Sequence, residues 1–566
     1  MPLDGSPADG GAFLAGRAGS TGQEAARPSS AGPPAASPAA ASPAGASAVG
    51  ASTGADIEFS PSGALPARSA DAPASDAAVT GRGHRATPET QAAWRDPVLW
   101  LIAAVVFGSY STISVFRYLR RDPTSWDLGI FTEYVKQFAH LHAPIVDIRG
   151  PGFNLLGDHF HPIVAVLAPF FLLAPTPVTL LLAQALLTAL SVIPVYQAAR
   201  HLLTQGAAQA ITAAYGLSWG LQQLANYDFH EIAFAVPLLA ASLSALIRGR
   251  TRTAIWWALP LVLVKEDQGF TLAALGLIIA FSYRRHGPGL FLAGWGLAWS
   301  LLAILVIIPH YNPGHAYGYW LDGGTLQHGL HLSAGTVLHQ FVTAAQTKLT
   351  TVALVLLVTG FLALRSPLVL AIVPDLLLRF VSTNFQYWGT QWHYNAPLMP
   401  IVFIAAIDAI ARVRAAPGAG VTSRLFATLG RHGPAIMLTA CAALAFQFPL
   451  STLWSPATYK LPVQVRIEDT AMALVPDGVT VDADAEMLAP LAARADTYWL
   501  GNHATNPLTE YIVFDQRSAD FVPGAPDPQA YLNSSVIGSR YQLIFNDDGI
   551  GVLKRLPAPA PASSRR

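Results

Sequence analysis

Long runs of apolar residues dominate the chain between residues 98 and 453, and short polar loops separate them. A helix that crosses a bilayer needs about 20 mainly apolar residues. The pattern predicts a mainly α-helical, polytopic membrane bundle over 96–453, with about 11 spans of unequal length. The predicted spans are 98–118, 178–200, 206–225, 231–248, 253–264, 267–283, 288–309, 349–364, 367–381, 397–413 and 434–453.

Four apolar segments are too short for an ordinary crossing. The pair 253–264 and 267–283 predicts either a re-entrant pair or two tilted helices. In the first large loop, 120–177, the residues 129–142 place apolar side chains at helical spacing and predict a surface helix. The segment 163–174 ends before a proline and predicts an interfacial or re-entrant segment.

After residue 454 the pattern changes to short apolar stretches between polar ones. The stretches 479–481, 511–514 and 541–545 predict buried strands, and 486–493 and 527–532 predict helices between them. We therefore predict a small α/β domain over 454–566. It contains no glycine-rich phosphate loop, so the sequence gives no reason to expect a nucleotide.

Residues 1–95 consist mainly of Ala, Pro, Ser and Gly and show no apolar period. Such a segment cannot bury enough apolar surface to offset the entropy lost on ordering, so it predicts a disordered tail. A binding tail is the alternative interpretation. No apolar stretch follows the first residues, so the sequence does not predict a signal peptide there.

Composition supports the membrane class. The chain is 52% hydrophobic and 12% charged. Its 34 basic and 34 acidic residues balance, so no excess of positive charge favours nucleic acid as a partner. Its one cysteine, Cys441, lies in an apolar run, and no disulfide can form within the chain.

The loops alternate in charge along the chain. Cytoplasmic loops carry an excess of Lys and Arg, so we predict that the N-terminus and the basic loops lie inside. The outer side then carries the α/β domain, the C-terminus and most acidic, His, Trp and Tyr residues of the loops. The basic segment 117–121 is an exception on the outer side. This places the chain in the cytoplasmic membrane, with the basic loops 200–201, 248–252, 284–286, 365 and 412–431 inside.

Ionisable and polar side chains from five separate segments gather on the predicted outer side. Charged groups at membrane depth are costly and are usually paired or functional, so this convergence is the strongest functional signal in the chain. Asp127 is the candidate catalytic residue, since its nearest basic neighbour along the chain is Arg121. The candidate substrate-binding residues are Asp158, His159, His161, Asp228, His230, Glu231, Lys265, Glu266, Arg379, Gln391, His393 and Tyr394.

The charged residues among these also have structural interpretations. Asp375 and Arg379 lie one helical turn apart, which equally predicts a buried pair that fixes helix packing. The acidic residues of 228–231 suit the start of a helix, where the dipole favours negative charge. Lys265 suits a turn at the membrane interface.

The aromatic and histidine residues have alternatives as well. The residues 388–394 include two Trp and a Tyr, which favour an aromatic belt at the interface over a platform for sugars. His159 and His161 have a spacing that could place both on one metal ion, but an isolated pair of this kind favours a role other than metal ligand.

The order of the polar motifs resembles the bacterial membrane-protein family known as domain of unknown function 2079. The resemblance covers about 98–550 and leaves out the tail. The matching segments are 126–131 (WDLGIF), 157–162 (GDHFHP), 168–169 (AP), 229–231 (FHE), 265–267 (KED) and 393–394 (HY).

That family is similar to the polyprenyl-phosphate-sugar glycosyltransferases of the GT-C fold. In those enzymes the first outer loop carries an acidic residue, surface helices follow, the second span ends in basic residues, and a soluble domain often follows the last span. This chain has the same plan, with Asp127, the segments 129–142 and 163–174, and Arg200. It departs from the paired acids of those enzymes, since Asp122 does not lie beside Asp127.

The resemblance implies a hexosyltransferase that moves a sugar from a polyprenyl-phosphate carrier to an acceptor on the outer face. Such a reaction needs a base for the acceptor hydroxyl, for which Asp127 is the candidate. It also needs cations or donors at the leaving phosphate, for which Lys265, Arg379, His159 and His393 are candidates.

Two other functions stay open. A transporter or lipid flippase without chemistry would use the pair Asp375 and Arg379 and the broken segment 253–283 as its binding site. A non-enzymatic protein would bind a partner through the outer α/β domain. The polar groups gather on one face and no internal repeat is visible, which favours the enzyme. The acidic, His-rich loop could hold a divalent cation, so the cofactor stays open.

Overall fold

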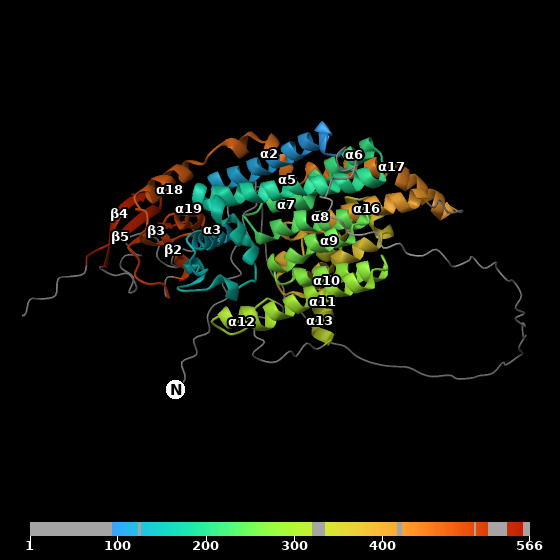
Figure 1. Ribbon diagram of the computed structural model, residues 1–566. Coiled ribbons are helices and arrows are strands. Elements are labelled where there is room, and N and C mark those ends of the chain that lie inside the picture. Colours follow the sequence, from blue (N-terminus) through green and yellow to red (C-terminus); the bar gives the residue numbers. More distant parts are fainter. Residues whose placement is uncertain are drawn as a thin grey trace, which may run out of the picture. The chain divides into compact units, whose positions relative to one another are not determined.

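The computed structural model describes residues 93–122, 126–319, 334–415, 421–502, 505–518 and 540–557. The predicted tail, apart from its last three residues, and the helix predicted at 527–532 lie outside these residues. Helices make up most of the described chain, and one sheet follows them near the C-terminal end (Figure 1).

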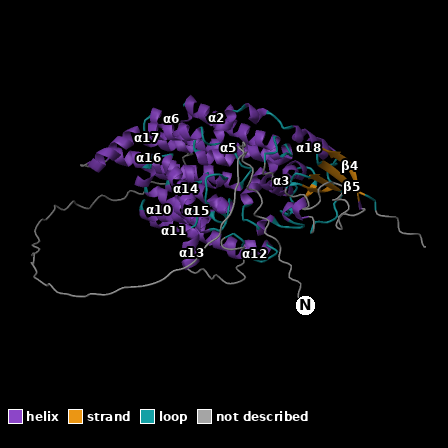
Figure 2. Ribbon diagram, turned by 180° about the vertical axis from the view of Figure 1, so that it is seen from behind, coloured by secondary structure: helices purple, strands orange, loops and turns teal. Residues whose placement is uncertain are grey.

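The membrane part consists of helices that follow the predicted apolar runs. Its first half contains α2 (Pro97–Leu119), α5 (Pro177–Leu202), α6 (Gln205–Gly216), α7 (Trp219–Ala225), α8 (Ala235–Ile247), α9 (Thr251–Ala258), α10 (Gln268–Phe281) and α11 (His286–Leu302). Its second half contains α12 (Ile308–Tyr311), α13 (Ala334–Val342), α14 (Ala345–Leu357), α15 (Val373–Val381), α16 (Leu398–Ala415) and α17 (Val421–Ala445). Figure 2 shows α10, α11 and α13–α15 together, on the opposite side of the helices from α2 and α6.

The first helix begins where its sequence allows a helix to begin. The carboxylate of Asp96 accepts a hydrogen bond of 2.9 Å from the backbone N–H of Val98, and Pro97 occupies the first helical position, where no donor is needed. The Tyr110 hydroxyl donates to the Gly216 carbonyl over 2.7 Å and holds α2 against α6. Local capping and one buried hydrogen bond therefore fix α2 in the bundle.

Four helices of the described chain are long and apolar enough to cross a membrane: Pro97–Leu119, Pro177–Leu202, His286–Tyr311 and His393–Arg414. Of the predicted spans, about 11 of unequal length, these four are therefore long helices, and the full number stays a prediction. Turns and prolines break the other apolar runs into shorter helices. The run 206–225 divides at Ser218 into α6 and α7, and the run 253–264 passes from α9 into the 3₁₀ turn η5 (Leu259–Leu263) at Pro260.

Glycines allow α10 and α11 to pack closely as an antiparallel pair. A Cβ atom added at Gly276 would lie 2.4 Å from the backbone nitrogen of Ala293, and one added at Gly289 would lie 2.4 Å from that of Ala280. Close backbone approach through small residues is typical of helices packed in membranes. The first residue of α10, Gln268, lines the cavity described below.

The first large loop, 120–177, contains α3 (Trp126–Ala139), which starts three residues before the predicted segment 129–142. The structure has a helix over most of this segment, and every residue from Leu128 to Val135 is buried by other parts of the protein. Its place at the membrane surface stays a prediction. The helix ends at Ala139, and Leu141 is 94% exposed with a left-handed φ of 57°. Elements on both sides of α3 cover it.

The segment predicted at 163–174 forms two short turns, η3 (Pro162–Leu167) and α4 (Ala168–Leu173). Phe170 and Leu173 project from it and are 57% and 86% exposed. An apolar, exposed element too short to span suits the boundary between bilayer and water.

The C-terminal region forms the predicted α/β domain, with one sheet in the order β2-β1-β3-β5-β4. β1 pairs in parallel with β2 and β3, whereas β5 pairs antiparallel with β3 and β4. The prediction missed β2, β5 and α18. The elements are α18 (Val463–Ala473), β1 (Thr480–Ala483), α19 (Ala485–Ala492), β2 (Asp496–Trp499), β3 (Tyr511–Asp515), β4 (Tyr541–Asp547) and β5 (Ile550–Arg555).

The α/β domain packs on the first outer loop (Figure 1). A Cβ atom at Gly129 of α3 would lie 3.0 Å from Leu488 Cβ of α19, so glycine permits this contact. The Trp126 and Trp499 rings meet edge to face with centroids 4.6 Å apart. The helix that carries Asp127 is therefore packed against the α/β domain.

The basic segment 117–121, which broke the charge rule, forms ion pairs and hydrogen bonds with the C-terminal region. Arg121 Nη2 lies 2.7 Å from Asp469 Oδ1 of α18, and Arg120 Nη1 donates to the Lys460 carbonyl over 3.0 Å. These arginines have partners within the protein, which accounts for their departure from the loop-charge pattern.

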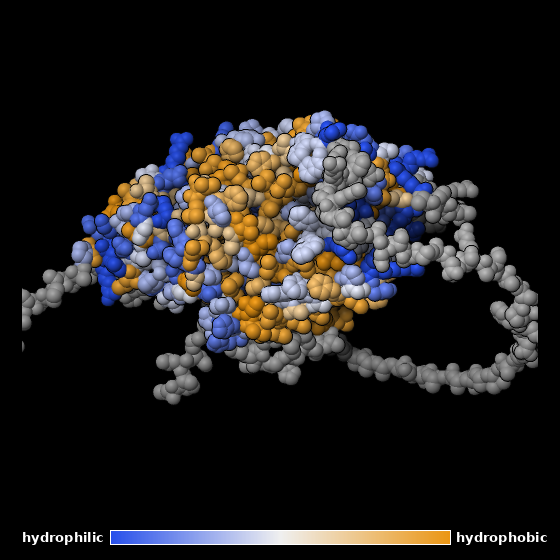
Figure 3. All heavy atoms as spheres, in the orientation of Figure 1, coloured by the Kyte–Doolittle hydropathy of each residue, from blue (hydrophilic) through white to orange (hydrophobic). Residues whose placement is uncertain are grey.

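Figure 3 shows a broad apolar surface over the helices and hydrophilic residues gathered over the α/β domain. Large apolar side chains such as Leu101, Trp256 and Phe281 are 63%, 72% and 64% exposed. An apolar patch of this kind is typical of a surface in contact with lipid.

Candidate functional site

A buried ion network joins two of the predicted segments. Lys265 Nζ lies 3.1 Å from Glu231 Oε1, and His230 Nδ1 lies 3.0 Å from Glu231 Oε2. Burial alone would lower the pKa of Lys265, but the carboxylates of Glu231 and Glu266 hold that pKa well above its usual value. Lys265 is therefore an ammonium group at neutral pH.

Glu266, the neighbour of Lys265, fixes the first outer loop to the start of α10. Its carboxylate contacts His159 Nδ1 at 2.7 Å and accepts hydrogen bonds from the Tyr317 hydroxyl at 2.8 Å and the Phe160 backbone N–H at 3.0 Å. Burial would raise the pKa of Glu266, yet His159 holds it at about 2. Burial and Lys265 oppose a charge on His159, whereas Glu266 raises its pKa above the usual value.

Asp158 is the second buried acid of the first loop. Arg149 Nη2 lies 3.1 Å from Asp158 Oδ1, and the Tyr319 hydroxyl donates to the same oxygen. The Tyr319 ring stacks on His159 with centroids 4.1 Å apart. Burial would raise the pKa of Asp158, but the guanidinium of Arg149 holds it below its usual value. Asp158 is therefore a charged residue with partners on two sides.

These groups surround a cavity of about 570 Å³, open solvent included. Its lining combines a few charged groups with phenol and apolar side chains. The predicted residues that line it are His159, His230, Lys265, Arg379 and Tyr394. Lining residues that were not among the predicted site residues include Asp267, Tyr317, Tyr319, Asp375 and Tyr387.

Arg379 lines the cavity, but most of its donors bind neighbouring protein groups. Its guanidinium contacts Asp375 Oδ2 at 3.2 Å and Asn395 Oδ1 at 3.1 Å. It also donates to the carbonyl oxygens of Tyr387 at 2.9 Å and Tyr394 at 3.2 Å. Arg379 thus positions the loop that carries two of the cavity's tyrosines.

Asp127 is the second residue of α3 and does not itself line the cavity. The Tyr227 hydroxyl donates to Asp127 Oδ2 over 2.8 Å. The Tyr227 ring lies 4.5 Å from the His393 ring, which stacks on His230 at 3.7 Å. Ring contacts therefore connect Asp127 to a residue of the cavity wall, with no direct contact between Asp127 and Lys265 among the described residues.

His161 and His393 are both buried close to this chain of rings. Neither ring nitrogen of His393 has a hydrogen-bond partner within the described residues, and the same holds for Nδ1 of His161. Burial lowers the pKa of His161 to about 4, so this imidazole is neutral at pH 7. Buried polar atoms without partners are uncommon, and ligand sites are one place where they occur.

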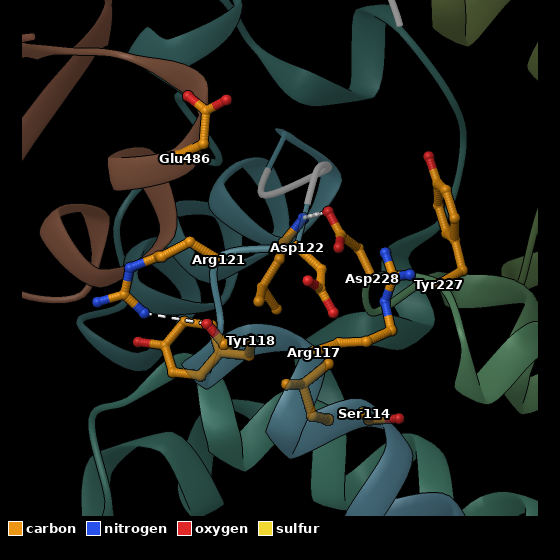
Figure 4. Close-up of a pocket in the computed structure, with 10 residues that line it drawn as sticks. Ser114, Arg117, Tyr118, Arg121, Asp122, Tyr227, Asp228 and Glu486 are labelled. Atoms are coloured by element: carbon orange, nitrogen blue, oxygen red, sulfur yellow. Dashed lines mark hydrogen bonds between the residues drawn. The ribbon is translucent and has the colours of Figure 1, made fainter. Parts of the chain in front are cut away.

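A second, narrower cavity lies where α2, α3 and α19 meet (Figure 4). Asp228 Oδ2 accepts a hydrogen bond of 3.2 Å from the backbone N–H of Leu128, so it caps α3 rather than a helix of its own segment. Figure 4 shows Arg117 beside Asp122 and Asp228, with Glu486 of α19 on the far side.

Gln391 does not line either cavity. The structure thus brings the first loop, the 228–231 turn, Lys265, Glu266 and the loop before α16 to one region, and Gln391 lies at its edge. Trp388, which the sequence assigned to an aromatic belt, is buried and lies over Lys348 Nζ at 4.4 Å from its ring centroid. Among the described residues, no group of three His, Cys, Asp or Glu side chains could hold a metal ion.

Sequence reasoning missed Arg149, Tyr317, Tyr319 and Tyr387. The sequence did contain a signal for two of the tyrosines. A hydroxyl that binds a buried carboxylate of this site must come from a loop at the same end of the helices as that carboxylate. The segment 316–319 follows an apolar run and carries two tyrosines two residues apart. Alternation at this spacing places both rings on one side of an extended chain.

The fold and the site define a polytopic membrane protein with an α/β domain packed over its first loop. The chain matches the family described as "Predicted membrane protein (DUF2079)" over residues 122–552, and it belongs to that family. The resemblance seen in the sequence is thereby confirmed.

Among solved structures, the chain is similar to ArnT from Cupriavidus metallidurans in two crystal structures. The one bound to undecaprenyl phosphate is 12% identical with a TM-score of 0.46, and the match covers 81% of this chain and 98% of that one. The apo structure is 13% identical with a TM-score of 0.47, and the match covers 82% and 98%. No curated protein matches the chain.

Proposed function

We propose that this protein is a membrane glycosyltransferase that moves a sugar from a polyprenyl-phosphate carrier to an acceptor on the outer face of the cytoplasmic membrane. One observation carries the proposal: a cavity lined by five separate segments contains a buried ammonium group, Lys265, and ring contacts connect its wall to the partner of the Asp127 carboxylate. The donor class follows from the resemblance of the loop order to GT-C enzymes.

Lys265 suits the phosphate end of the donor. Within the described residues it has one ion-pair partner, Glu231 at 3.1 Å, although an ammonium group has three donors. Its raised pKa keeps it charged at working pH. Arg379 is less suited to the phosphate, because its donors are occupied by Asp375 and by backbone carbonyls. We therefore assign the leaving phosphate to Lys265 and the support of the cavity wall to Arg379.

Asp127 suits the base. In the proposed reaction the carboxylate takes the proton from the acceptor hydroxyl, and the acceptor oxygen forms a bond to the anomeric carbon. The bond between that carbon and the phosphate oxygen breaks, and its electron pair stays on the phosphate beside Lys265. With one carboxylate and no covalent intermediate, the configuration at the anomeric carbon inverts. Tyr227 orients Asp127 through the hydrogen bond of 2.8 Å.

The position of the cavity also separates this proposal from transport. Its wall comes from the outer loops and from the helix ends next to them, including Tyr317, Tyr387 and Lys265. A transporter of the alternating-access kind keeps its site near the midplane, between repeats. We therefore favour a transferase over a flippase.

The test is turnover of a radiolabelled polyprenyl-phosphate hexose in membranes that contain the protein. We expect Asp127→Asn to lower transfer by about 100-fold or more, because the base is lost. We expect Lys265→Gln to lower it by about 100-fold through loss of charge at the leaving phosphate. Asp548→Asn and Lys554→Met, both on the surface of the α/β domain, serve as matched controls.

Binding of polyprenyl phosphate and thermal unfolding of the purified variants separate chemistry from folding. Loss of turnover in Asp127→Asn, with binding and melting temperature retained, supports the base. Full turnover in that variant removes Asp127 from the reaction. Lipid translocation without any sugar transfer in the unaltered protein would contradict the proposal and favour a flippase.

A further inference from the structure

A third hollow lies beside the candidate site and differs from the cavity at Lys265 in its chemistry. It is an open hollow of about 830 Å³, open solvent included, between the end of α7, the loop before α16 and the end of α17. We call it the neutral groove, and its lining includes Gln223, Asn226, Thr390, Gln391, Gln447 and Phe448.

No charged side chain lines the neutral groove within the described chain. An adjoining hollow of about 400 Å³ shares Thr390 and is lined otherwise by Gln346 and threonines, again without a charge. Uncharged amides and hydroxyls therefore continue from one hollow into the next. By contrast, Lys265, Asp267 and Arg379 line the cavity of the donor.

The amide side chains of the neutral groove are available to a ligand. Within the described residues, the side chains of Gln223, Asn226, Gln391 and Gln447 have no hydrogen-bond partner in the protein. Gln223 is nevertheless only 8% exposed. Each amide offers donors and acceptors together, which matches hydroxyl groups that also donate and accept.

An aromatic ring completes this lining. Phe448 stacks on Trp219 with centroids 5.4 Å apart, so its position is fixed from one side. A fixed apolar ring among amides suits a ligand with both C–H faces and hydroxyl edges. A charged ligand would lose hydration in the groove without gaining a counter-charge.

Two residues of the groove are sequence neighbours of aromatic residues that connect to Asp127. Asn226 precedes Tyr227 and Gln391 precedes Trp392 in the sequence. The Tyr227 and Trp392 rings meet edge to face at 5.5 Å, and the Tyr227 hydroxyl binds Asp127. The groove is therefore connected to the candidate base through Tyr227, and it shares no lining residue with the cavity that contains Lys265.

We propose that the neutral groove binds the acceptor and that the acceptor is an uncharged, hydroxyl-rich glycan. This inference rests on the proposed function, because the term acceptor has meaning only for a transferase. It adds the chemical class of the second substrate, which the donor cavity does not define.

The experiment measures binding of neutral oligosaccharides of four to six hexoses to the purified full chain. The panel contains α- and β-linked glucans, a mannan and a galactan fragment, with oligogalacturonate of equal length as the anionic probe. We expect at least one neutral probe to bind and the anionic probe not to bind. Each of Gln391→Leu and Asn226→Leu weakens binding by about 3-fold, and the double variant weakens it by about 10-fold.

Gln542→Leu is the matched control, because Gln542 is an exposed amide on β4 outside the groove. The inference is overturned if no neutral probe binds, if the anionic probe binds equally, or if the groove variants bind like the control. Gln391 is exposed, so Gln391→Leu alone decides the result should Asn226→Leu not fold.

Donor turnover distinguishes this inference from the proposed function. If turnover depends on Asp127 and Lys265 but the groove binds no glycan, the transferase stands and the acceptor class is wrong. If glycan binds in the groove and no donor is turned over, the groove is a glycan site and the transferase proposal fails.

Discussion

Arg379 and Lys265 line the same cavity, yet their donors have different amounts of freedom. Arg379 contacts Asp375, Asn395 and two backbone carbonyls, whereas Lys265 has one ion-pair partner within the described residues, Glu231. A planar guanidinium with five fixed donors suits the support of a loop, and a compact ammonium suits a point charge on a ligand. Two residues that the sequence grouped together therefore receive different roles.

We expect Arg379→Lys to destabilise the protein by about 2 kcal/mol or more, because lysine keeps the charge but loses several buried hydrogen bonds. Thermal unfolding in detergent measures this effect. Arg517→Lys, at a half-exposed side chain of the α/β domain, is the control. An unchanged melting temperature together with loss of polyprenyl-phosphate binding would instead place Arg379 at the ligand.

Glu133 gives a second prediction for a single residue. It is 1% exposed on α3, and burial raises its pKa from 4.5 to about 8. The folded state therefore binds a proton that the unfolded state releases, and the free energy of unfolding falls as pH rises from about 4.5 to 8. We expect Glu133→Gln to raise the melting temperature by about 2 °C or more at pH 8 and to have little effect at pH 4.5.

The control for this prediction is Glu510→Gln, at an exposed position beside β3. Melting curves at several pH values between 4.5 and 8 give the comparison. A parallel shift of Glu133→Gln at every pH would show that the proton at Glu133 is not the cause.

The sequence was sufficient to predict those site residues whose charge is costly to bury between apolar runs. Glu231, Lys265 and Glu266 stand out because ionisable groups are rare between apolar runs. The tyrosines at 317 and 319 carry only their spacing as a signal, since a phenol has no such cost until its partner is known. His159 was predicted as a site residue, but its partner required the structure, because Glu266 belongs to a segment far along the chain.

At the scale of elements, α3 is the piece whose packing the sequence did not indicate. Its apolar spacing gave the helix correctly, but periodicity does not tell which element covers the outer side. Gly129 and Trp126 contact α19 and Trp499 of the α/β domain, more than 350 residues later in the chain. Contacts between residues so far apart leave no local pattern in the sequence.

The composition of one missed strand, β2, explains why the sequence did not indicate it. The strands β1, β3 and β4 begin in apolar stretches and were predicted, whereas β2 (Asp496–Trp499) has four residues and starts with an acid. Such a stretch lacks the alternation that marks a strand. A different cause shortened the predicted helices. Hydropathy alone joins apolar runs that Pro260 and Ser218 interrupt in the structure.

Gly129→Val tests the contact between α3 and α19. The added side chain would enter space held by Leu488 Cβ, 3.0 Å from the first added carbon, so we expect the α/β domain to detach from the loop. Limited proteolysis should then cut the region before α18 at least about 3-fold faster, and sugar transfer should fall because Asp127 lies two residues from Gly129.

The matched control is Gly108→Val in α2, where an added Cβ atom has nothing within 4 Å. Equal proteolysis of the two variants would contradict the contact. Faster proteolysis of Gly129→Val without loss of transfer would keep the contact but remove its effect on Asp127.

At the scale of the whole described chain, polarity divides the molecule. The α/β domain, the first loop and the cavity lie at the helix ends where α2 finishes, whereas Arg200, Arg248 and Arg412 lie at or near the C-terminal ends of α5, α8 and α16. The surface between these regions is apolar (Figure 3). This division supports the predicted sidedness, with the cavity outside.

Labelling of single cysteines tests that sidedness in intact cells. The chain has one cysteine, Cys441, which is buried, so Cys441→Ala removes the background at small cost. We expect Gln542→Cys on β4 to react with a membrane-impermeant maleimide before permeabilisation, because cytoplasmic loops are the basic ones. Thr253→Cys, exposed beside Arg252, should react only afterwards. The reverse pattern would place Asp127 and Lys265 on the cytoplasmic side, where soluble sugar nucleotides are available, and would remove the reason for a lipid-linked donor.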